Sequence, residues 1–448
     1  MTLPDGSKTP LLLQHIQFIT DPVGYLETRT KKYGDICPIS IGSSYKNILC
    51  ISNPSVLQTI FSNPQKFPAP GEFNDILRFV GGNNSLFLID GSKHSNQRKL
   101  LYPPFHGDRM HNYGQLICQI TKKVTNEWTV GTPFSIWDSM KKITMRVILE
   151  VVFGLHEGER YTQIEEQLSA LLNALNNPLI ASFMFFPFLA KDYGSWSPGG
   201  KWKFQQQQID DLLDAEISDR RAEGESDQTD ILTLLLSARY ENGERMSNEE
   251  LRDQLVTLMV GAYNNITISL TWAFYWIHYL PEVKQKLLKE LDIIGENPDP
   301  MTLFKLPYLT AVYQETLRIY PPTMFTLMRH IQEPVEIAGK KLEAGKAFGC
   351  IYLLHQREDL YPEPKQFKPE RFLERQFSLY EYMPFGAGIR RCIGDALTEF
   401  EIKLVLAIIL KSYQLELADS RPVKPKFQSL SIGPTTGAVK MIMTGERN

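Results

Sequence analysis

The feature that most constrains the fold of this chain is one long helical pattern over residues 247–280. It begins with SNEE, in which Ser247 and Glu250 have the S-x-x-E spacing of a helix capping box. It stops at Pro281, which cannot continue a helix. A helix of about 30 residues is roughly 45 Å long. Such a helix must cross a large unit, so the pattern predicts a mainly helical fold of substantial size.

Nothing in the 448 residues divides the chain into separate units. There is no Gly/Ser-rich or Pro-rich linker, no internal repeat and no low-complexity tract. An apolar content of 43% and a charged content of 22% are typical of a globular protein that can bury a cofactor. We therefore expect residues 1–448 to form one domain, mainly α with small β-sheets. The net charge of −3 argues against nucleic acid as a partner.

The chain shows no targeting or membrane-spanning pattern. Its first residues lack the basic-then-apolar order of a signal peptide, and no stretch approaches the roughly 20 apolar residues of a membrane span. The five cysteines are scattered without a CxxC pair, so neither a disulfide framework nor a structural zinc site is expected. These patterns predict a monomeric cytoplasmic protein without a transmembrane anchor.

One cysteine has a distinctive setting in the segment FGAGIRRCIG, residues 385–394. Apolar residues recur at helical spacing from Cys392 onward, which predicts that Cys392 begins a helix. The helix dipole and free backbone N–H groups would lower the pKa of its thiol. Gly394 leaves room for a flat ligand, and Arg390 could pair with an anionic group on that ligand. The spacing alone is equally compatible with an incidental buried cysteine.

The same segment matches, at every fixed position, the signature F-x-x-G-x-R-x-C-x-G of the cytochrome P450 superfamily, which this chain resembles. The resemblance implies the cytochrome P450 fold, with haem b between the long distal helix (the I helix) and the helix after the cysteine (the L helix). Cys392 would be the thiolate ligand of iron, with Phe385 beside the sulfur. A thiolate ligand favours O–O cleavage. The chain looks most like soluble bacterial members, cyanobacterial ones in particular.

Further motifs occur in the order expected from this resemblance. ETLR places Glu315 and Arg318 on one helix face, and FKPERF supplies Arg371. A single Glu/Arg pair is usually a surface ion pair. In this order before a cysteine loop, the resemblance implies a three-residue network that supports the haem side of the core and does no chemistry.

Two positions in GSKHSNQRKLL suit the carboxylates of a haem. His94 and Arg98 are four residues apart and face one side of a helix. The resemblance implies that this pair binds the haem propionates, since two donors on one face suit two carboxylates. Arg329 is a third candidate, and Arg390 a fourth.

The distal helix departs from the pattern of the family. Its members usually carry Ala-Gly, a variable residue, an acid and a threonine. The aligned residues here are Gly261, Ala262, Tyr263 at the variable position, Asn264 and Asn265. All of these except Tyr263 are our catalytic candidates. Dioxygen activation needs two protons at the distal face. A carboxyl group can relay a proton, whereas an amide cannot near neutral pH. We therefore expect an oxidation without the usual acid–threonine relay, unless both amides face neighbouring helices.

Three chemistries are compatible with this departure. Hydroxylation could continue with protons from water or substrate. Radical coupling of an aromatic N–H or O–H substrate would bring its own proton. A hydroperoxide could instead be rearranged without dioxygen or reductase. A haem-binding protein without turnover is an alternative from a different class.

The resemblance also places the substrate contacts, and nearly all of them are apolar or aromatic. Each such residue is, taken singly, more often part of a core. Together they favour a hydrophobic, flat aromatic small molecule of the secondary-metabolite type. Electrons would come from external ferredoxin and ferredoxin reductase, or from a flavodoxin-type donor. The candidate contact residues are Phe73, Ile76, Leu86, Phe87, Tyr263, Thr323, Met324 and Phe325.

Overall fold

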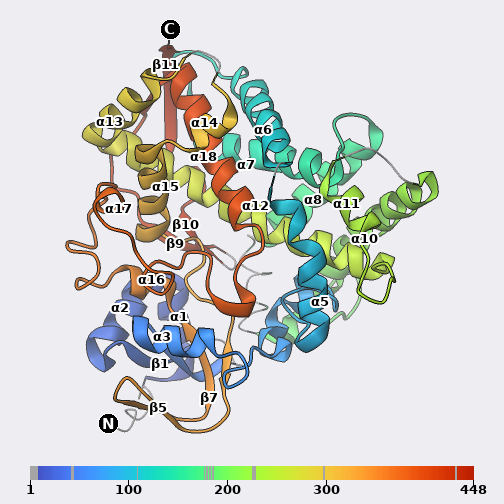
Figure 1. The fold of residues 1–448 in the computed structure, drawn as a ribbon, viewed down its shortest axis with the longest axis vertical. Helices are drawn as coiled ribbons and strands as arrows, with labels where there is room; N and C mark the ends of the chain where they lie inside the picture. The colour runs from blue at the N-terminus through green and yellow to red at the C-terminus, as the bar shows by residue number, and fades with distance from the viewer. Residues whose placement is uncertain are drawn as a thin grey trace.

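The protein is mainly helical with small β-sheets, in a computed structural model (Figure 1). The structure describes residues 9–41, 45–107, 109–175, 177, 180, 183, 186–224, 229–295, 298–428 and 431–447. Within these ranges every helix is too short or too polar to span a bilayer.

The helices from the N-terminus to the centre of the chain are α1 (Leu11–Thr20), α2 (Pro22–Tyr33), α3 (Pro54–Ser62), α4 (Arg78–Gly81), α5 (Gly91–Leu101), α6 (Arg109–Thr125), α7 (Ile136–Val147), α8 (Glu159–Leu175), α10 (Pro198–Glu223) and α11 (Ile231–Ser237). They are followed by α12 (Asn248–Tyr279), α13 (Pro281–Asp292), α14 (Pro300–Phe304), α15 (Pro307–Ile319), α16 (Ile351–His355), α17 (Arg371–Glu374) and α18 (Asp395–Ser412). Short 3₁₀ turns are η1 (Gly71–Leu77), η2 (Pro103–Phe105), η5 (Pro187–Ala190) and η6 (Gly388–Arg390), and η3 (Ile148–Val152) is a π-helical turn.

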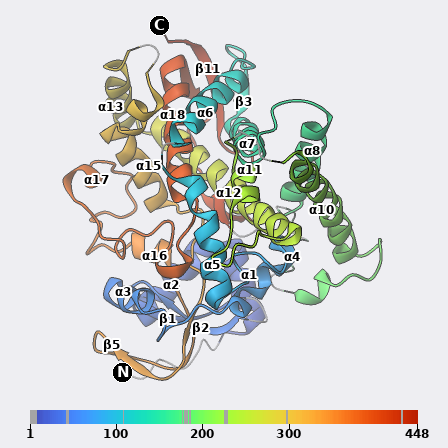
Figure 2. The same ribbon diagram turned by 45° about the vertical axis from the view of Figure 1, so that its right-hand side comes forward.

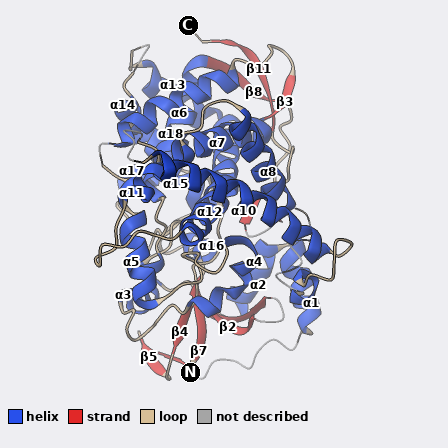
Figure 3. Ribbon diagram, turned by 90° about the vertical axis from the view of Figure 1, so that its right-hand side faces the viewer, coloured by secondary structure: helices blue, strands red, loops and turns tan. Residues whose placement is uncertain are grey.

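The described strands form four small sheets. One has the order β1-β2-β7-β4, with β1 (Ile36–Ile41), β2 (Tyr45–Ile51), β7 (Gly345–Gly349) and β4 (Arg329–Ile331). A second has the order β3-β11-β8, with β3 (Pro133–Ser135), β11 (Lys440–Glu446) and β8 (Tyr413–Leu417). These two sheets lie at opposite ends of the molecule (Figure 3). The two-stranded sheets are β9 (Pro425–Gln428) with β10 (Ser431–Pro434), and β5 (Val335–Ile337) with β6 (Lys340–Leu342).

The long helix predicted from the sequence is α12. Both bonds of its capping box form: the Glu250 N–H donates to Ser247 Oγ at 3.0 Å, and the Ser247 N–H donates to Glu250 Oε2 at 3.1 Å. These bonds satisfy donors that the first helical turn leaves unpaired. α12 runs through the middle of the molecule and packs against α7, α10, α18 and the strand β10 (Figures 1 and 2). Most of its surface is therefore buried, and Trp272 is fully enclosed.

The structure brings Glu315 and Arg318 of α15 together with Arg371 of α17. Arg318 donates from Nε and Nη2 to the two carboxylate oxygens of Glu315, at 2.6 and 2.9 Å. Arg371 Nε donates to Glu315 Oε1 at 3.2 Å. Arg318 also donates to the backbone carbonyls of His355 and Pro364. This buried network joins α15 to the long loop that precedes the cysteine.

Candidate functional site

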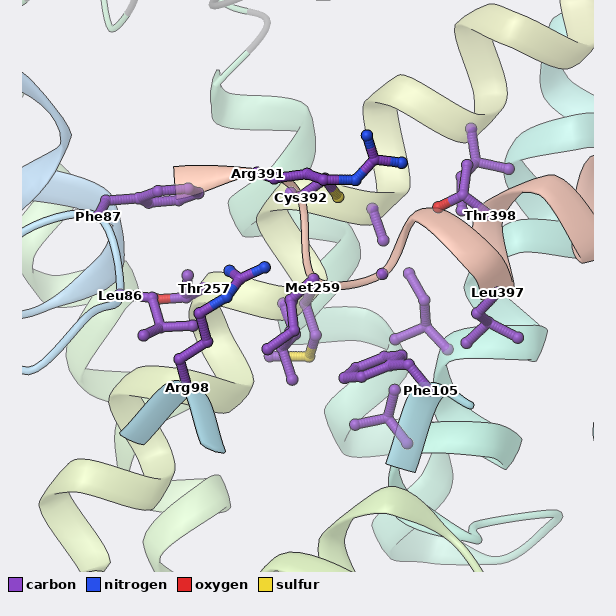
Figure 4. Close-up of a pocket in the computed structure, with 18 of the residues that line it drawn as sticks. Leu86, Phe87, Arg98, Phe105, Thr257, Met259, Arg391, Cys392, Leu397 and Thr398 are labelled. Carbon is purple, nitrogen blue, oxygen red and sulfur yellow. The ribbon is translucent and has the colours of Figure 1, made fainter. Parts of the chain in front are cut away.

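Two adjoining cavities meet at Cys392. The smaller lies between α12, α5 and the loop that leads into α18, and its volume is about 1000 Å³ when the space open to solvent is included. The larger, about 1750 Å³ on the same basis, extends from the same loop toward α1 and the β9–β10 hairpin. Seven residues line both: Phe87, Gly261, Ile266, Leu327, Arg390, Cys392 and Thr398. Figure 4 shows Phe87 and Arg98 on one side of the smaller cavity, with Phe105, Leu397 and Thr398 on the other.

The cysteine loop is held in a tight turn by its glycines. Gly388 has φ +68°, and a Cβ there would lie 2.5 Å from the carbonyl oxygen of Phe61. Only glycine combines that backbone conformation with so close an approach. The Cys392 N–H donates to the Phe385 carbonyl at 2.9 Å and closes the loop. Phe385 itself lines the larger cavity.

The structure corrects two sequence predictions about Cys392. The helix α18 begins at Asp395, so Cys392 precedes the helix rather than beginning it. The pKa of the Cys392 thiol is raised to about 11, because burial by the surrounding protein outweighs a hydrogen bond from the Gly394 N–H. The exposed surface of the Cys392 side chain faces the cavities. A bound metal cation is what would deprotonate such a thiol.

Four cationic or donor side chains gather beside the cavities: the buried His94 of α5 and Arg329 of β4, and the half-buried Arg98 of α5 and Arg390 of η6. Burial lowers the pKa of Arg329 to about 9 and that of Arg390 to about 10. Burial lowers the pKa of His94 to about 3, helped by the positive charges of Arg390 and Arg98. A cluster in which each charge destabilises its neighbours fits an anionic ligand.

Arg390 and Arg98 differ in how many of their donors are already used by hydrogen bonds within the protein. Arg390 donates to the carbonyls of Leu86, Ala69 and Ile89, so only its Nε lacks a partner among the described residues. This use of the guanidinium differs from the predicted pairing of Arg390 with a ligand. Arg98 has no hydrogen-bond partner within the described ranges and lines the smaller cavity. The unpaired Arg98 and the shared positive charge fit the two propionates of haem.

Gly261, Ala262 and both asparagines of α12 border this space. Gly261 lines both cavities, and a Cβ there would meet nothing within 4 Å. Ala262 lines the smaller cavity, whereas Asn264 and Asn265 line the larger. This placement differs from the alternative in which both amides face only neighbouring helices.

The structure brings most of the predicted substrate contacts to the cavities but not all. Leu86 and Phe87 line the smaller, and Phe87, Thr323, Met324 and Phe325 line the larger. Tyr263 is 2% exposed and faces the core beside Lys141, because it is turned away from the cavity side of α12. The Phe73 ring packs outside both cavities against His330, with ring centroids 5.2 Å apart. The side chain of Ile76 lies outside the described residues.

Several lining residues come from segments that carried no sequence signal. Phe18 of α1 stacks on Phe325 with ring centroids 6.1 Å apart, and its edge meets Phe427 of β9 at 5.4 Å. Ser431 of β10 also lines the larger cavity. These residues are distant in sequence, so no local pattern could have revealed them.

Comparisons with known proteins agree with this geometry. The family model described as Cytochrome P450 matches residues 3–441. The mycobacterial protein named cytochrome P450 135B1, from Mycobacterium tuberculosis and Mycobacterium bovis, is 32% identical over 441 residues, which cover 98% of this chain and 91% of that protein. Cytochrome P450 138 of Mycobacterium tuberculosis is 28% identical, covering 97% of this chain and 95% of that protein.

Solved structures show the same fold. A cyanobacterial protein, CYP120A1, determined with bound retinoic acid, matches with a TM-score of 0.84 and 22% identity, over 96% of each chain. The haem domain of cytochrome P450DA matches with a TM-score of 0.83 and 21% identity, over 97% of this chain and 95% of that one. The cysteine loop, the cationic cluster and the fold thus agree with the family match, and this chain belongs to the cytochrome P450 family.

Proposed function

We propose that this protein is a haem-thiolate oxidoreductase that oxidises a hydrophobic, aromatic small molecule with dioxygen and electrons from a separate donor. Membership of the family implies monooxygenase-type chemistry, a haem with a cysteine ligand and external redox partners. We propose a ferredoxin or flavodoxin-type protein as the donor, and residues 1–448 as one catalytic domain. The observation that carries the proposal is the meeting of two largely apolar cavities at Cys392, beside buried and half-buried cationic side chains.

Each part of the site has a separate task in this proposal. Haem, when bound, supplies the activation of dioxygen, and Cys392 supplies the thiolate that tunes it. Arg98, with His94 and Arg329 nearby, neutralises the propionates. The aromatic wall of Phe87, Phe325 and their neighbours excludes water and orients a flat substrate.

The reaction that is favoured depends on how protons reach the distal face, where Asn264 and Asn265 replace the usual acid and threonine. Amide groups hold water through hydrogen bonds but do not titrate near neutral pH. Protons for hydroxylation would then come from ordered water or from the substrate. Radical coupling of an aromatic N–H or O–H substrate is the version of the proposal that depends least on a relay, because that substrate supplies a proton itself.

A hydroperoxide rearrangement is a second candidate function. The amides at positions 264 and 265 favour it. A hydroperoxide substrate already carries oxygen at the peroxide oxidation level, so its rearrangement requires no proton relay. Such a reaction would use the same cysteine loop and the same apolar cavity. It would need neither a reductase nor dioxygen.

The test that separates these functions is the dependence on dioxygen. The holoenzyme would be assayed with aromatic and aliphatic candidates in a surrogate ferredoxin system, with and without dioxygen, and with matching hydroperoxides. We expect product only when dioxygen and reductant are both present. Product mass would then distinguish inserted oxygen from a coupled dimer. Product formed anaerobically from a hydroperoxide would instead establish the second candidate and refute the first.

Restoring the usual relay should change how reducing equivalents are used. In the double variant Asn264→Glu, Asn265→Thr, a titratable carboxyl replaces an amide, and a general acid commonly contributes a hundredfold or more. We expect the ratio of organic product to released hydrogen peroxide to rise about tenfold. Both products are measured per NADPH consumed at saturating substrate, so that any loss of affinity caused by removing the Asn265 amide does not lower the ratio. The control is Asn248→Glu at the exposed start of the same helix, and an unchanged ratio in the double variant would refute the relay argument.

A further inference from the structure

One polar cluster interrupts the apolar wall of the larger cavity. It consists of Asn265 and Ser269 of α12 and Ser431 of β10. The wall around it is built from Phe18, Leu77, Phe87, Leu175, Met324, Phe325, Leu327 and Phe427. Arg329 and Arg390 also border this cavity, but their guanidinium groups donate to backbone carbonyls. The cluster itself contains neither a carboxylate nor a cationic side chain.

Two hydrogen bonds determine the orientation of the Asn265 amide. Its Nδ2 donates to the Gly261 carbonyl at 2.9 Å, and its Oδ1 accepts from Ser431 Oγ at 2.8 Å. In the flipped amide, Oδ1 would face the Gly261 carbonyl and two acceptors would meet. The Ser431 hydroxyl hydrogen is therefore committed to Asn265. The bond also ties β10 to α12, which pack against each other.

The donor that remains in the cluster is one N–H of the Asn265 amide. A primary amide has two N–H donors, and Gly261 uses one of them. No acceptor among the described residues takes the second. Ser269 adds no further donor, since its hydroxyl donates to the backbone carbonyl of Asn265 at 2.8 Å. Asn265 is half-buried and lines the cavity, so this second N–H is available to a ligand that brings an acceptor, and a bound ligand without an acceptor would leave it unpaired.

We propose that Asn265 is the hydrogen-bond donor that anchors the substrate, and that Ser431 is a positioning residue that holds the amide in its donating orientation. The substrate class is then an aromatic molecule with one neutral acceptor oxygen, such as a ketone or an ether. An anionic or cationic anchor would have no counter-charge in the cluster. This inference rests on the proposed function only in that it takes the larger cavity as the substrate site.

A matched pair of probes tests this donor. Benzophenone carries a carbonyl acceptor between two rings, and diphenylmethane has the same rings without it. Their dissociation constants would be measured on the holoenzyme by calorimetry, which needs no turnover. The control variant Asn265→Leu keeps the cavity volume and removes the donor, so it reports the difference between the two probes that solvation alone causes. We expect the ratio of the diphenylmethane Kd to the benzophenone Kd to be about fivefold higher in the wild type than in Asn265→Leu.

The serine is tested by conservative replacement. Ser431→Ala should remove most of the benzophenone preference, whereas Ser431→Thr retains the hydroxyl and should keep it. Ser237→Ala, on the exposed end of α11, is the matched control and should change nothing. Circular dichroism and the haem spectrum verify that each variant is folded and loaded.

Each outcome decides between alternatives. A preference that is absent from the wild type, or that survives Asn265→Leu, overturns the proposed anchor. Equal loss in Ser431→Ala and Ser431→Thr overturns the positioning role. If the preference is present but no product depends on dioxygen, the proposed reaction fails and the anchor stands. If product forms but no preference exists, the anchor fails alone.

Discussion

Replacing Cys392 with serine should abolish the thiolate spectrum of the haem-loaded protein. Cys392 lines both cavities and lies at the end of the loop that Gly388 folds against Phe61. A serine hydroxyl is nearly the same size but does not ionise near neutral pH, and its oxygen does not donate electron density to iron as a sulfur does. We therefore expect the red-shifted carbon monoxide band of the reduced protein to disappear, and product formation to fall to background.

The matched control for this variant is Cys118→Ser. Cys118 lies on α6 away from both cavities, and burial raises the pKa of its thiol to about 11, as for Cys392. The control should keep both the carbon monoxide band and the activity. Survival of that band in Cys392→Ser would contradict the assignment of the ligand and, with it, the reading of the whole site. Haem content measured on both variants separates loss of the ligand from loss of the cofactor.

The parts of the site that sequence could predict are those with a local signal. The capping box of Ser247 and Glu250 lies within four residues, and both of its bonds form at the start of α12. The cysteine loop is likewise a compact motif, since the turn at Gly388 is made by its own residues and one neighbouring carbonyl. The mainly helical fold follows from such patterns and from the family match.

Properties that depend on tertiary burial could not be predicted in this way. The pKa of Cys392 was expected to fall at a helix N-terminus, yet burial raises it, and the helix starts three residues later. Arg390 was expected to bind a ligand, yet carbonyls from residues more than 300 positions earlier take most of its donors. Tyr263 was expected to contact the substrate because it lies within the distal-helix motif, yet its side chain is buried in the core.

The substrate wall was the least predictable part, because three distant segments build it. Phe18, Phe325 and Phe427 meet from α1, the segment before β4 and the strand β9. Only Phe325 was among the predicted contacts, and Phe18 and Phe427 have no sequence context that separates them from an ordinary core phenylalanine. The partner of Asn265 is equally remote, since Ser431 lies 166 residues further along the chain.

The second large effect is expected on stability, from Arg318→Ala. Arg318 and Glu315 are fully buried, and Arg318 makes bonds to Glu315 and to three backbone carbonyls. Removing the guanidinium leaves the Glu315 carboxylate buried with only the weaker bond from Arg371 and the Lys368 N–H. Breaking a buried ion pair by deleting one partner typically costs about 3–5 kcal/mol. We expect a loss of free energy of unfolding in that range, measured by urea unfolding followed by circular dichroism.

A surface pair with the same spacing provides the control for this loss. Arg78 and Asp75 are also three residues apart, and their side chains are 50% and 55% exposed. Arg78→Ala should cost at most about 1 kcal/mol, because water solvates the carboxylate that remains. The double variant Glu315→Gln, Arg318→Met should be less destabilised than Arg318→Ala, since it leaves no buried carboxylate without its partner and Arg371 keeps its bond to the Pro362 carbonyl. Equal losses for Arg318→Ala and Arg78→Ala would show that the buried network contributes no more than a surface ion pair, and that the position of the cysteine loop is maintained by packing instead.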